Sequence, residues 1–184
     1  MYTLLLVDDE EDVIEVIERK VSWEQIGFQV VGHAGNGFKA LEMMEDMQPD
    51  VVMTDIRMPY MDGLELCSNI RQRFPATKLL LFTGFDDFEY AKEAVHLEIE
   101  EYILKPLNLA EITEVFKKLK TKLDDELNEK KNTDILKQYY AASLPVLQSN
   151  FYTTLIEGRI PENELGRYMR DLSLIHISEP TRRS

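Results

Sequence analysis

Val-Val-Met-Thr-Asp-Ile-Arg-Met-Pro, residues 51–59, is the stretch from which the architecture of this chain can be worked out. Four apolar or β-branched residues precede Asp55, a pattern typical of a strand that is covered on both faces of a sheet. Pro59 ends the run because proline has no backbone N–H to donate within a sheet. We therefore expect Asp55 to lie at the end of a central strand.

Three other apolar runs also end in polar residues. They are residues 4–7 before Asp8 and Asp9, residues 79–82 before Thr83, and residues 102–104 before Lys105. In an open parallel α/β sheet, the carboxyl ends of the strands lie along one edge, and ligands bind at that edge. The four strand ends are therefore predicted to bring these polar side chains and Asp55 into one pocket.

Strand and helix patterns alternate along residues 1–122. Strands are expected at residues 2–7, 28–34, 51–55, 78–83 and 102–104. Apolar side chains at helical spacing follow the strands, and Asp86 or Asp87 is expected to cap the fourth helix. Five strands alternating with helices predict an α/β fold with a doubly wound parallel sheet.

An extended helical linker is expected after the last strand. From Asn108 the apolar residues step by three and four, close to a heptad seam. Residues 128–134 are wholly polar, so a coiled coil, a solvated helix and a hinge are all compatible with a linker at residues 123–144. Pro145 is expected to interrupt the helical pattern.

Beyond Pro145, residues 145–172 read as the start of a helical middle region. One helix is expected over residues 146–158, and a shorter one is expected to begin at residues 160–162. Residues 173–184 resemble a vector-encoded tail more than natural protein, so we exclude them from the interpretation of the fold.

The composition limits the classes of partner. The formal net charge of −13 argues against a strong nucleic-acid or anionic-membrane surface on the residues present. One cysteine, Cys67, allows no internal disulfide, and no long apolar span is found, so a cytoplasmic location without membrane association is expected. His33 and His96 lack metal-ligand spacing to each other or to Cys67, which disfavours a zinc site.

The acidic residues at two strand ends favour a divalent cation. Glu11 and Asp12 are explained by the helix dipole, which stabilises acids in a first turn. Two acids at the strand end itself are costly when buried unless a cation lies between them. Mg²⁺ needs only two or three carboxylates because it keeps several waters.

With Mg²⁺ bound, the carboxylate of Asp55 could attack phosphorus as a nucleophile. Lys105 would neutralise the remaining charge of a phosphoryl group, and the Thr83 hydroxyl could donate to another of its oxygens. The predicted pocket is therefore suited to phosphoryl transfer.

These residues resemble the receiver domain of two-component response regulators, over about residues 1–122. The resemblance is carried by Asp8-Asp9, Asp55 with Met58-Pro59 and Gly63, Thr83-Gly84, and Lys105-Pro106. It implies a flavodoxin-like (βα)5 fold with Asp55 as the phosphoacceptor. It also implies that Thr83 and Lys105 contact the phosphoryl group, and that Asp8, Asp9 and Asp55 bind Mg²⁺ together with the backbone carbonyl of Arg57.

The resemblance assigns three residues to a conformational switch, the first of which is Thr83. Pro106 would follow a cis peptide bond, and Tyr102 matches an aromatic residue that turns inward when the threonine moves. The residue pattern alone leaves Tyr102 open, because a half-buried aromatic on an edge strand serves as well as a moving switch.

The implied function is a phosphorylation-activated switch rather than an enzyme. A sensor histidine kinase would supply the phosphoryl group, and a homodimer would form through the fourth helix, fifth strand, fifth helix and linker helix. Several segments, among them residues 55–63 and 155–161, resemble AraC-type response regulators, which implies control of transcription through a DNA-binding domain missing from this chain.

Other functional classes fit the residues less well. An aspartyl-nucleophile phosphatase would need a second acid two residues after the first, where this chain has Arg57. A flavin-binding module would need a Ser/Thr/Gly phosphate loop after the first strand, where this chain has five acids. A receiver-like interaction module that is never phosphorylated remains the alternative.

Overall fold

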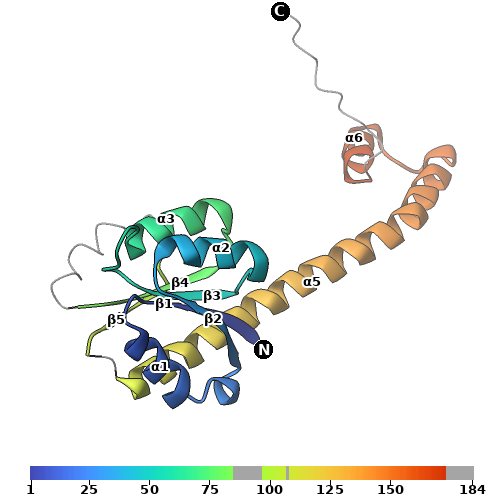
Figure 1. Ribbon diagram of the computed structural model, residues 1–184. Helices are drawn as coiled ribbons and strands as arrows, with labels where there is room; N and C mark the ends of the chain where they lie inside the picture. The colour runs from blue at the N-terminus through green and yellow to red at the C-terminus, as the bar shows by residue number, and fades with distance from the viewer. Residues whose placement is uncertain (85–96, 107, 173–184) are drawn as a thin grey trace, which may run out of the picture. The chain divides into compact units, whose positions relative to one another are not determined.

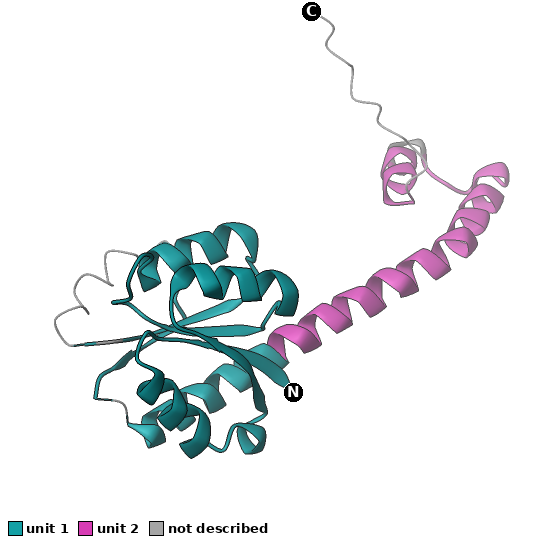
Figure 2. Ribbon diagram, viewed as in Figure 1, with its two compact units in different colours: residues 1–124 teal, residues 125–184 magenta. Residues whose placement is uncertain are grey.

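The computed structural model describes residues 1–84, 97–106 and 108–172, and Thr83 is described by its backbone only. Contacts between Cα atoms divide the chain into two compact units, Met1–Asp124 and Asp125–Ser184 (Figure 2). The predicted helix at residues 85–96, with its cap at Asp86 or Asp87, lies outside the described residues, as does the tail at residues 173–184.

The first unit contains one sheet of five parallel strands. In chain order they are β1 (Tyr2–Val7), β2 (Phe28–Ala34), β3 (Val51–Asp55), β4 (Lys78–Thr83) and β5 (Glu101–Leu104). Their order in the sheet is β2-β1-β3-β4-β5, so β1, β3 and β4 lie inside and the direction of winding changes between β1 and β3. The predicted doubly wound parallel sheet is confirmed.

Helices cover both faces of this sheet. They are α1 (Glu11–Lys20), the short 3-10 helix η1 (Trp23–Ile26), α2 (Gly37–Met47), α3 (Gly63–Arg73) and the first part of α5 (Leu109–Ile156). Figure 1 shows α2 and α3 on one face and α1 and α5 on the other. All five residues of β3 are buried, which explains why its sequence is continuously apolar up to the acid.

Side-chain caps fix where two of these helices begin. The Asn36 side chain accepts a hydrogen bond from the backbone N–H of Lys39, 3.0 Å away, at the start of α2. Asp62 accepts one from Glu65 N at 2.7 Å at the start of α3. Such caps satisfy helix-terminal donors, so α2 and α3 start at the sheet edge where β2 and β3 end.

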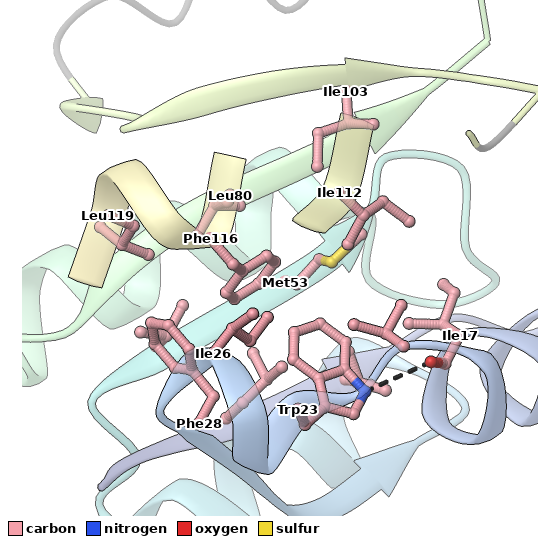
Figure 3. Packing of buried hydrophobic residues seen from close by; sticks show 14 of the residues in the cluster. Ile17, Trp23, Ile26, Phe28, Met53, Leu80, Ile103, Ile112, Phe116 and Leu119 are labelled. Atoms are coloured by element: carbon pink, nitrogen blue, oxygen red, sulfur yellow. Dashed lines mark hydrogen bonds between the residues drawn. The ribbon is translucent and has the colours of Figure 1, made fainter. Parts of the chain in front are cut away.

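Aromatic rings form the centre of the layer between the sheet and α1, η1 and α5 (Figure 3). The Phe116 ring meets Trp23 edge to face with centroids 4.7 Å apart, and meets Phe28 in the same manner at 5.0 Å. The indole Nε1 of Trp23 donates to the carbonyl of Ile17 at 3.2 Å. Edge-to-face pairs add to the free energy of burial, so Phe116 anchors α5 on the sheet.

Polar contacts hold the last turns of α5 within the first unit. The Tyr2 hydroxyl donates to Asp124 Oδ1 at 2.8 Å, which joins the start of β1 to the helix. Lys122 Nζ lies 2.5 Å from Glu100 Oε2, just before β5. The helix is therefore bound to the sheet on two sides before the second unit begins.

One expectation about the linker is corrected by the structure. α5 continues as a helix from Leu109 to Ile156 and passes through Pro145, where a break was expected. Residues 128–134 are helical as well, which agrees with the helical alternatives for the linker and not with the hinge. Pro145 removes the hydrogen bond to the carbonyl of Ala141, four residues earlier, and its ring crowds that carbonyl. Both Pro145 and Ala141 are exposed, so water can satisfy that carbonyl.

The short helix expected to begin at residues 160–162 is confirmed as α6 (Glu162–Asp171). Among the described helices, none combines the length and the apolar character needed to cross a membrane.

We expect Phe116→Ala to lower the free energy of unfolding by about 3–5 kcal/mol, because it removes a fully buried ring and its two edge-to-face partners. Urea unfolding followed by circular dichroism would measure the loss. The control is Phe38→Ala, the same change at a side chain that is 59% exposed, where a loss below about 1 kcal/mol is expected. Equal losses in both variants would contradict this account of the core.

Candidate functional site

Three carboxylates meet at the carboxyl ends of β1 and β3. Val7 pairs with Thr54 in the parallel ladder, so the residues that follow them, Asp8 and Asp55, emerge side by side. Ligand oxygens of Asp8, Asp9 and Asp55 lie within 4.8 Å of one another. Asp8 and Asp55 are buried and Asp9 is exposed, so the cluster opens to solvent on one side. The predicted meeting of these residues is observed.

The backbone around Asp55 is held from two directions. Thr54 Oγ1 donates to the Asp55 carbonyl at 2.9 Å, and Gly63 N donates to the Ile56 carbonyl at 2.8 Å. A Cβ atom at Gly63 would lie only 2.0 Å from the Asp55 carbonyl oxygen. Glycine is therefore required where α3 begins, because any side chain would displace the strand end that carries Asp55.

Lys105, which follows β5, reaches across this cluster. Its Nζ atom lies 3.2 Å from Asp55 Oδ2, 3.6 Å from Asp8 Oδ2 and 3.8 Å from Glu10 Oε1. The ammonium group also lies 5.2 Å from the centre of the Phe82 ring, within the range of a cation–π contact. The peptide bond between Lys105 and Pro106 is cis, as expected from the sequence.

Burial and charge shift the protonation of these groups. Burial raises the pKa of Asp8 to about 6 from an ordinary value of 3.8, against the lowering effects of the Glu10 backbone N–H and Lys105. Burial likewise raises the pKa of Asp55, although Lys105 opposes it. For Lys105, burial would lower the pKa, but the carboxylates of Asp55 and Asp8 outweigh it and raise the pKa. Burial therefore disfavours the charged forms of Asp8 and Asp55, and Lys105 offsets this cost only in part.

One oxygen in the cluster indicates that the carboxylates fit a cation. Asp8 Oδ1 accepts a hydrogen bond from Glu10 N at 2.8 Å. Asp8 Oδ2 is buried and has no hydrogen-bond partner among the described residues, and Lys105 is too distant, at 3.6 Å, to supply one. Mg²⁺ prefers oxygen ligands of this kind, so the residues present fit a bound divalent cation.

The other predicted site residues are placed less completely. Thr83 ends β4 opposite Leu104 of β5, so its backbone lies at the same sheet edge, while its side chain is outside the description. Arg57 is exposed in the loop after β3. Tyr102 is half-buried in β5 and packs against the core on the α2 and α3 face. The roles predicted for these residues in binding and switching stay predictions.

Two neighbours of Lys105 were not identified from the sequence. They are Glu10 and Phe82, which approach Lys105 from other parts of the chain. No local sequence pattern indicates either contact, because the lysine follows a different strand. Cys67 is buried, and burial raises the pKa of its thiol to about 12.

Comparison with known proteins agrees with this geometry. A family model described as the response regulator receiver domain matches residues 4–117. The chain belongs to this family. Its fold is also that of a solved receiver, the REC domain of AraT, a response regulator from Geobacillus stearothermophilus. That match has a TM-score of 0.66 and 36% sequence identity, and it covers 68% of this chain and 98% of the AraT domain.

Longer relatives extend beyond this receiver. The chain is 37% identical over 137 residues to the uncharacterized transcriptional regulatory protein YesN of Bacillus subtilis (strain 168), a match covering 74% of this chain and 37% of YesN. It is 26% identical over 164 residues to the transcriptional regulatory protein HptR of Staphylococcus aureus (strain NCTC 8325 / PS 47), covering 89% of this chain and 64% of HptR. The chain thus spans less than two thirds of either relative.

We expect Asp8→Asn to stabilise this receiver at pH 7 when divalent cations are chelated. The pKa of Asp8 is raised in the folded state, so its favourable contribution is complete below about pH 4 and is lost as the pH rises through about 6. Asparagine does not titrate and keeps an oxygen for the Glu10 N–H. The gain at pH 7 is on the order of 2–3 kcal/mol, and none is expected at pH 4.

Urea unfolding of both proteins at pH 4 and pH 7 in EDTA would test this expectation. Asp9→Asn is the matched control, because Asp9 belongs to the same cluster but is exposed, and a change below about 1 kcal/mol is expected there. A pH-independent difference between Asp8→Asn and the parent would show that burial of the Asp8 charge is not the cause.

Proposed function

We propose that this receiver accepts a phosphoryl group on Asp55 from a sensor histidine kinase and acts as a phosphorylation-controlled switch. The observation that carries the proposal is the position of Lys105 Nζ, 3.2 Å from the Asp55 carboxylate, at the solvent opening of a cluster of three acids. Membership of the receiver family supports the same assignment.

In the proposed reaction, a carboxylate oxygen of Asp55 forms a bond to phosphorus. The bond between phosphorus and the imidazole nitrogen of the donor histidine breaks, and the electron pair stays on that nitrogen, which then takes up a proton. Lys105 is placed to neutralise a phosphoryl oxygen once its contact with the free carboxylate is lost. The Thr83 hydroxyl is proposed to donate to another oxygen.

Asp8, Asp9 and Asp55, with the backbone carbonyl of Arg57, are proposed to hold Mg²⁺. The cation would supply neutralisation of the charge that gathers on the phosphoryl oxygens during transfer. The residues themselves keep the carboxylate of Asp55 in place, since Gly63 and Thr54 fix its backbone and Lys105 fixes its side chain.

Hydrolysis of the acyl phosphate would return the switch to its first state, so the chain is proposed to act as a switch with intrinsic chemistry rather than as an enzyme. Thr83, Tyr102 and Pro106 are proposed to take part in the switch. Thr83 ends β4, and Tyr102 and Pro106 lie on either side of Lys105 in the chain. The alternative, an interaction module that is never phosphorylated, would use the acids only for binding or structure.

The proposed output is control of transcription in the cytoplasm, with DNA contacted by a domain outside residues 1–184. The relatives YesN and HptR are transcriptional regulatory proteins by name, and each is longer than the part matched here. Dimerisation is proposed through the face formed by residues 85–96, β5 and the start of α5, together with the linker part of that helix.

A single phosphoryl adduct is expected on the intact chain after incubation with Mg²⁺ and acetyl phosphate. Intact-mass spectrometry would detect it, and Asp55→Asn should show none, because the amide cannot act as the nucleophile. EDTA should suppress the adduct on the parent chain. If neither acetyl phosphate nor any histidine kinase gives an adduct, the unphosphorylated interaction module becomes the better description.

Phosphorylation is also expected to strengthen self-association. Light scattering with acetyl phosphate and Mg²⁺ should give a higher average mass than without the phosphodonor, because added charge at Asp55 biases the dimer-forming face. Asp55→Asn is the control and should not respond. An unchanged mass in a sample whose phosphoryl adduct is verified would remove dimerisation from the proposed switch.

A further inference from the structure

A long part of α5 is helical and exposed to solvent. All nineteen residues from 125 to 143 are exposed, although they belong to one continuous helix. Most helical stability in proteins comes from packing one face of the helix against another surface. This segment is therefore a candidate for packing against a partner.

Four of the exposed apolar side chains on this part of α5 form a regular row, whereas Leu127 and Leu136 are exposed on other sides of the helix. Ile135, Tyr139, Ala142 and Val146 are separated by four, three and four residues, the spacing of a heptad seam. Ile135 is 52% exposed, Tyr139 is 75% exposed and Val146 is 61% exposed. We call these four residues the α5 stripe.

The opposite side of the same helix is already occupied by α6. The Tyr140 hydroxyl donates to the Asp171 carbonyl at 2.6 Å, and Gln148 Nε2 donates to the Leu172 carbonyl at 3.0 Å. Phe151 is buried, and its ring lies 6.2 Å from that of Tyr168. With 3.6 residues per turn, this side is roughly half a turn away from the α5 stripe, so α6 leaves the stripe open.

The residues that continue the stripe toward the N-terminus favour a second copy of this helix as the partner. Asn128 and Asn132 follow the same heptad spacing upstream of Ile135. With Tyr139 and Val146 at heptad position a, Asn132 also occupies position a, where one asparagine specifies the register and the oligomer state of a coiled coil. It can pair with its own equivalent only if two copies lie parallel and in register.

The charge of the segment is compatible with self-association. Residues 125–148 contain four acidic and three basic residues, whereas the whole chain has a formal net charge of −13. Two copies of this helix would therefore meet with little net repulsion, unlike two acidic receiver surfaces. A basic partner protein would have no comparable preference for this part of the chain.

We propose that two copies of the chain pair their α5 stripes as a short parallel coiled coil, with Ile135, Tyr139, Ala142 and Val146 in its seam. The pairing deepens the dimerisation proposed above, because it specifies how the linker part of α5 would associate. It does not require phosphoryl transfer, because the stripe is exposed and helical without it. The coiled coil would be weak by itself, because it is short and one of its four seam residues, Ala142, is small. Association of the receivers would reinforce it by holding the two helices close together.

Cysteine cross-linking of the full chain tests the proposal. Ala142→Cys and Ile135→Cys should each form a disulfide-linked dimer on mild oxidation, because equivalent seam residues face each other at a separation that a disulfide can span. Ala141→Cys is the matched control, since it places the same thiol on the adjacent exposed alanine and about 100° around the helix. The native thiol should not interfere, because Cys67 is fully buried.

The experiment is performed in the Asp55→Asn background, so that a failure of phosphoryl uptake cannot be confused with a failure of stripe pairing. Cross-linking at residues 135 and 142, but not at 141, supports the proposal. Equal cross-linking at 141 and 142, or none at 142, overturns it. Cross-linking at 142 without cross-linking at 135 would indicate antiparallel helices and would also overturn it.

Ile135→Lys combined with Tyr139→Lys gives an independent measurement. These changes lie on an exposed helical surface, so circular dichroism should show that the helix is kept. Sedimentation equilibrium should show weaker self-association than in the parent chain, and the phosphoryl adduct from acetyl phosphate should be unchanged. Self-association as strong as that of the parent would overturn the proposal while leaving the phosphorylation chemistry intact.

Discussion

The burial of Asp8 and Asp55, two carboxylates at adjacent strand ends, is the constraint around which the rest of the receiver is arranged. Each is removed from water, and burial raises the pKa of both. Lys105 offsets part of this cost from 3.2 and 3.6 Å, and one oxygen of Asp8 has no hydrogen-bond partner among the described residues. Such a cluster favours a bound divalent cation, which would in turn attract the negatively charged oxygens of a phosphoryl group.

The fold keeps these charges together by backbone geometry. Parallel pairing of β1 with β3 sets Asp8 beside Asp55, and the close approach of Gly63 to the Asp55 carbonyl fixes the start of α3. The hydrophobic layers on both faces of the sheet make the strand ends rigid. Because protein interiors are close-packed, a change of charge at the cluster must be accommodated by discrete rearrangement of its surroundings rather than by gradual deformation.

Helix α5 belongs to both units of the chain. Its first turns are packed by Ile112 and Phe116 and are tied to the sheet through Asp124 and Lys122. Within the second unit, α6 covers one side of its last turns, and the side that carries Ile135 and Tyr139 stays exposed. A continuous helix with two apolar sides can pack internally along one and associate along the other.

The alternation of apolar runs with helical patterns was sufficient to predict five parallel strands. It also predicted that Asp8, Asp55 and Lys105 would lie at one edge of the sheet, because each follows or ends a strand and the strands run in the same direction. The course of α5 could not be read locally: a polar run and Pro145 suggest an interruption, yet the helix continues where exposed carbonyls can bind water. Glu10 and Phe82 join the site only through contacts with Lys105 from another strand. The sequence alone therefore determined the strands, the helices and the sheet edge at which the site lies. The tertiary structure determined which charged and aromatic side chains surround Lys105, because those contacts join segments that are far apart in the sequence.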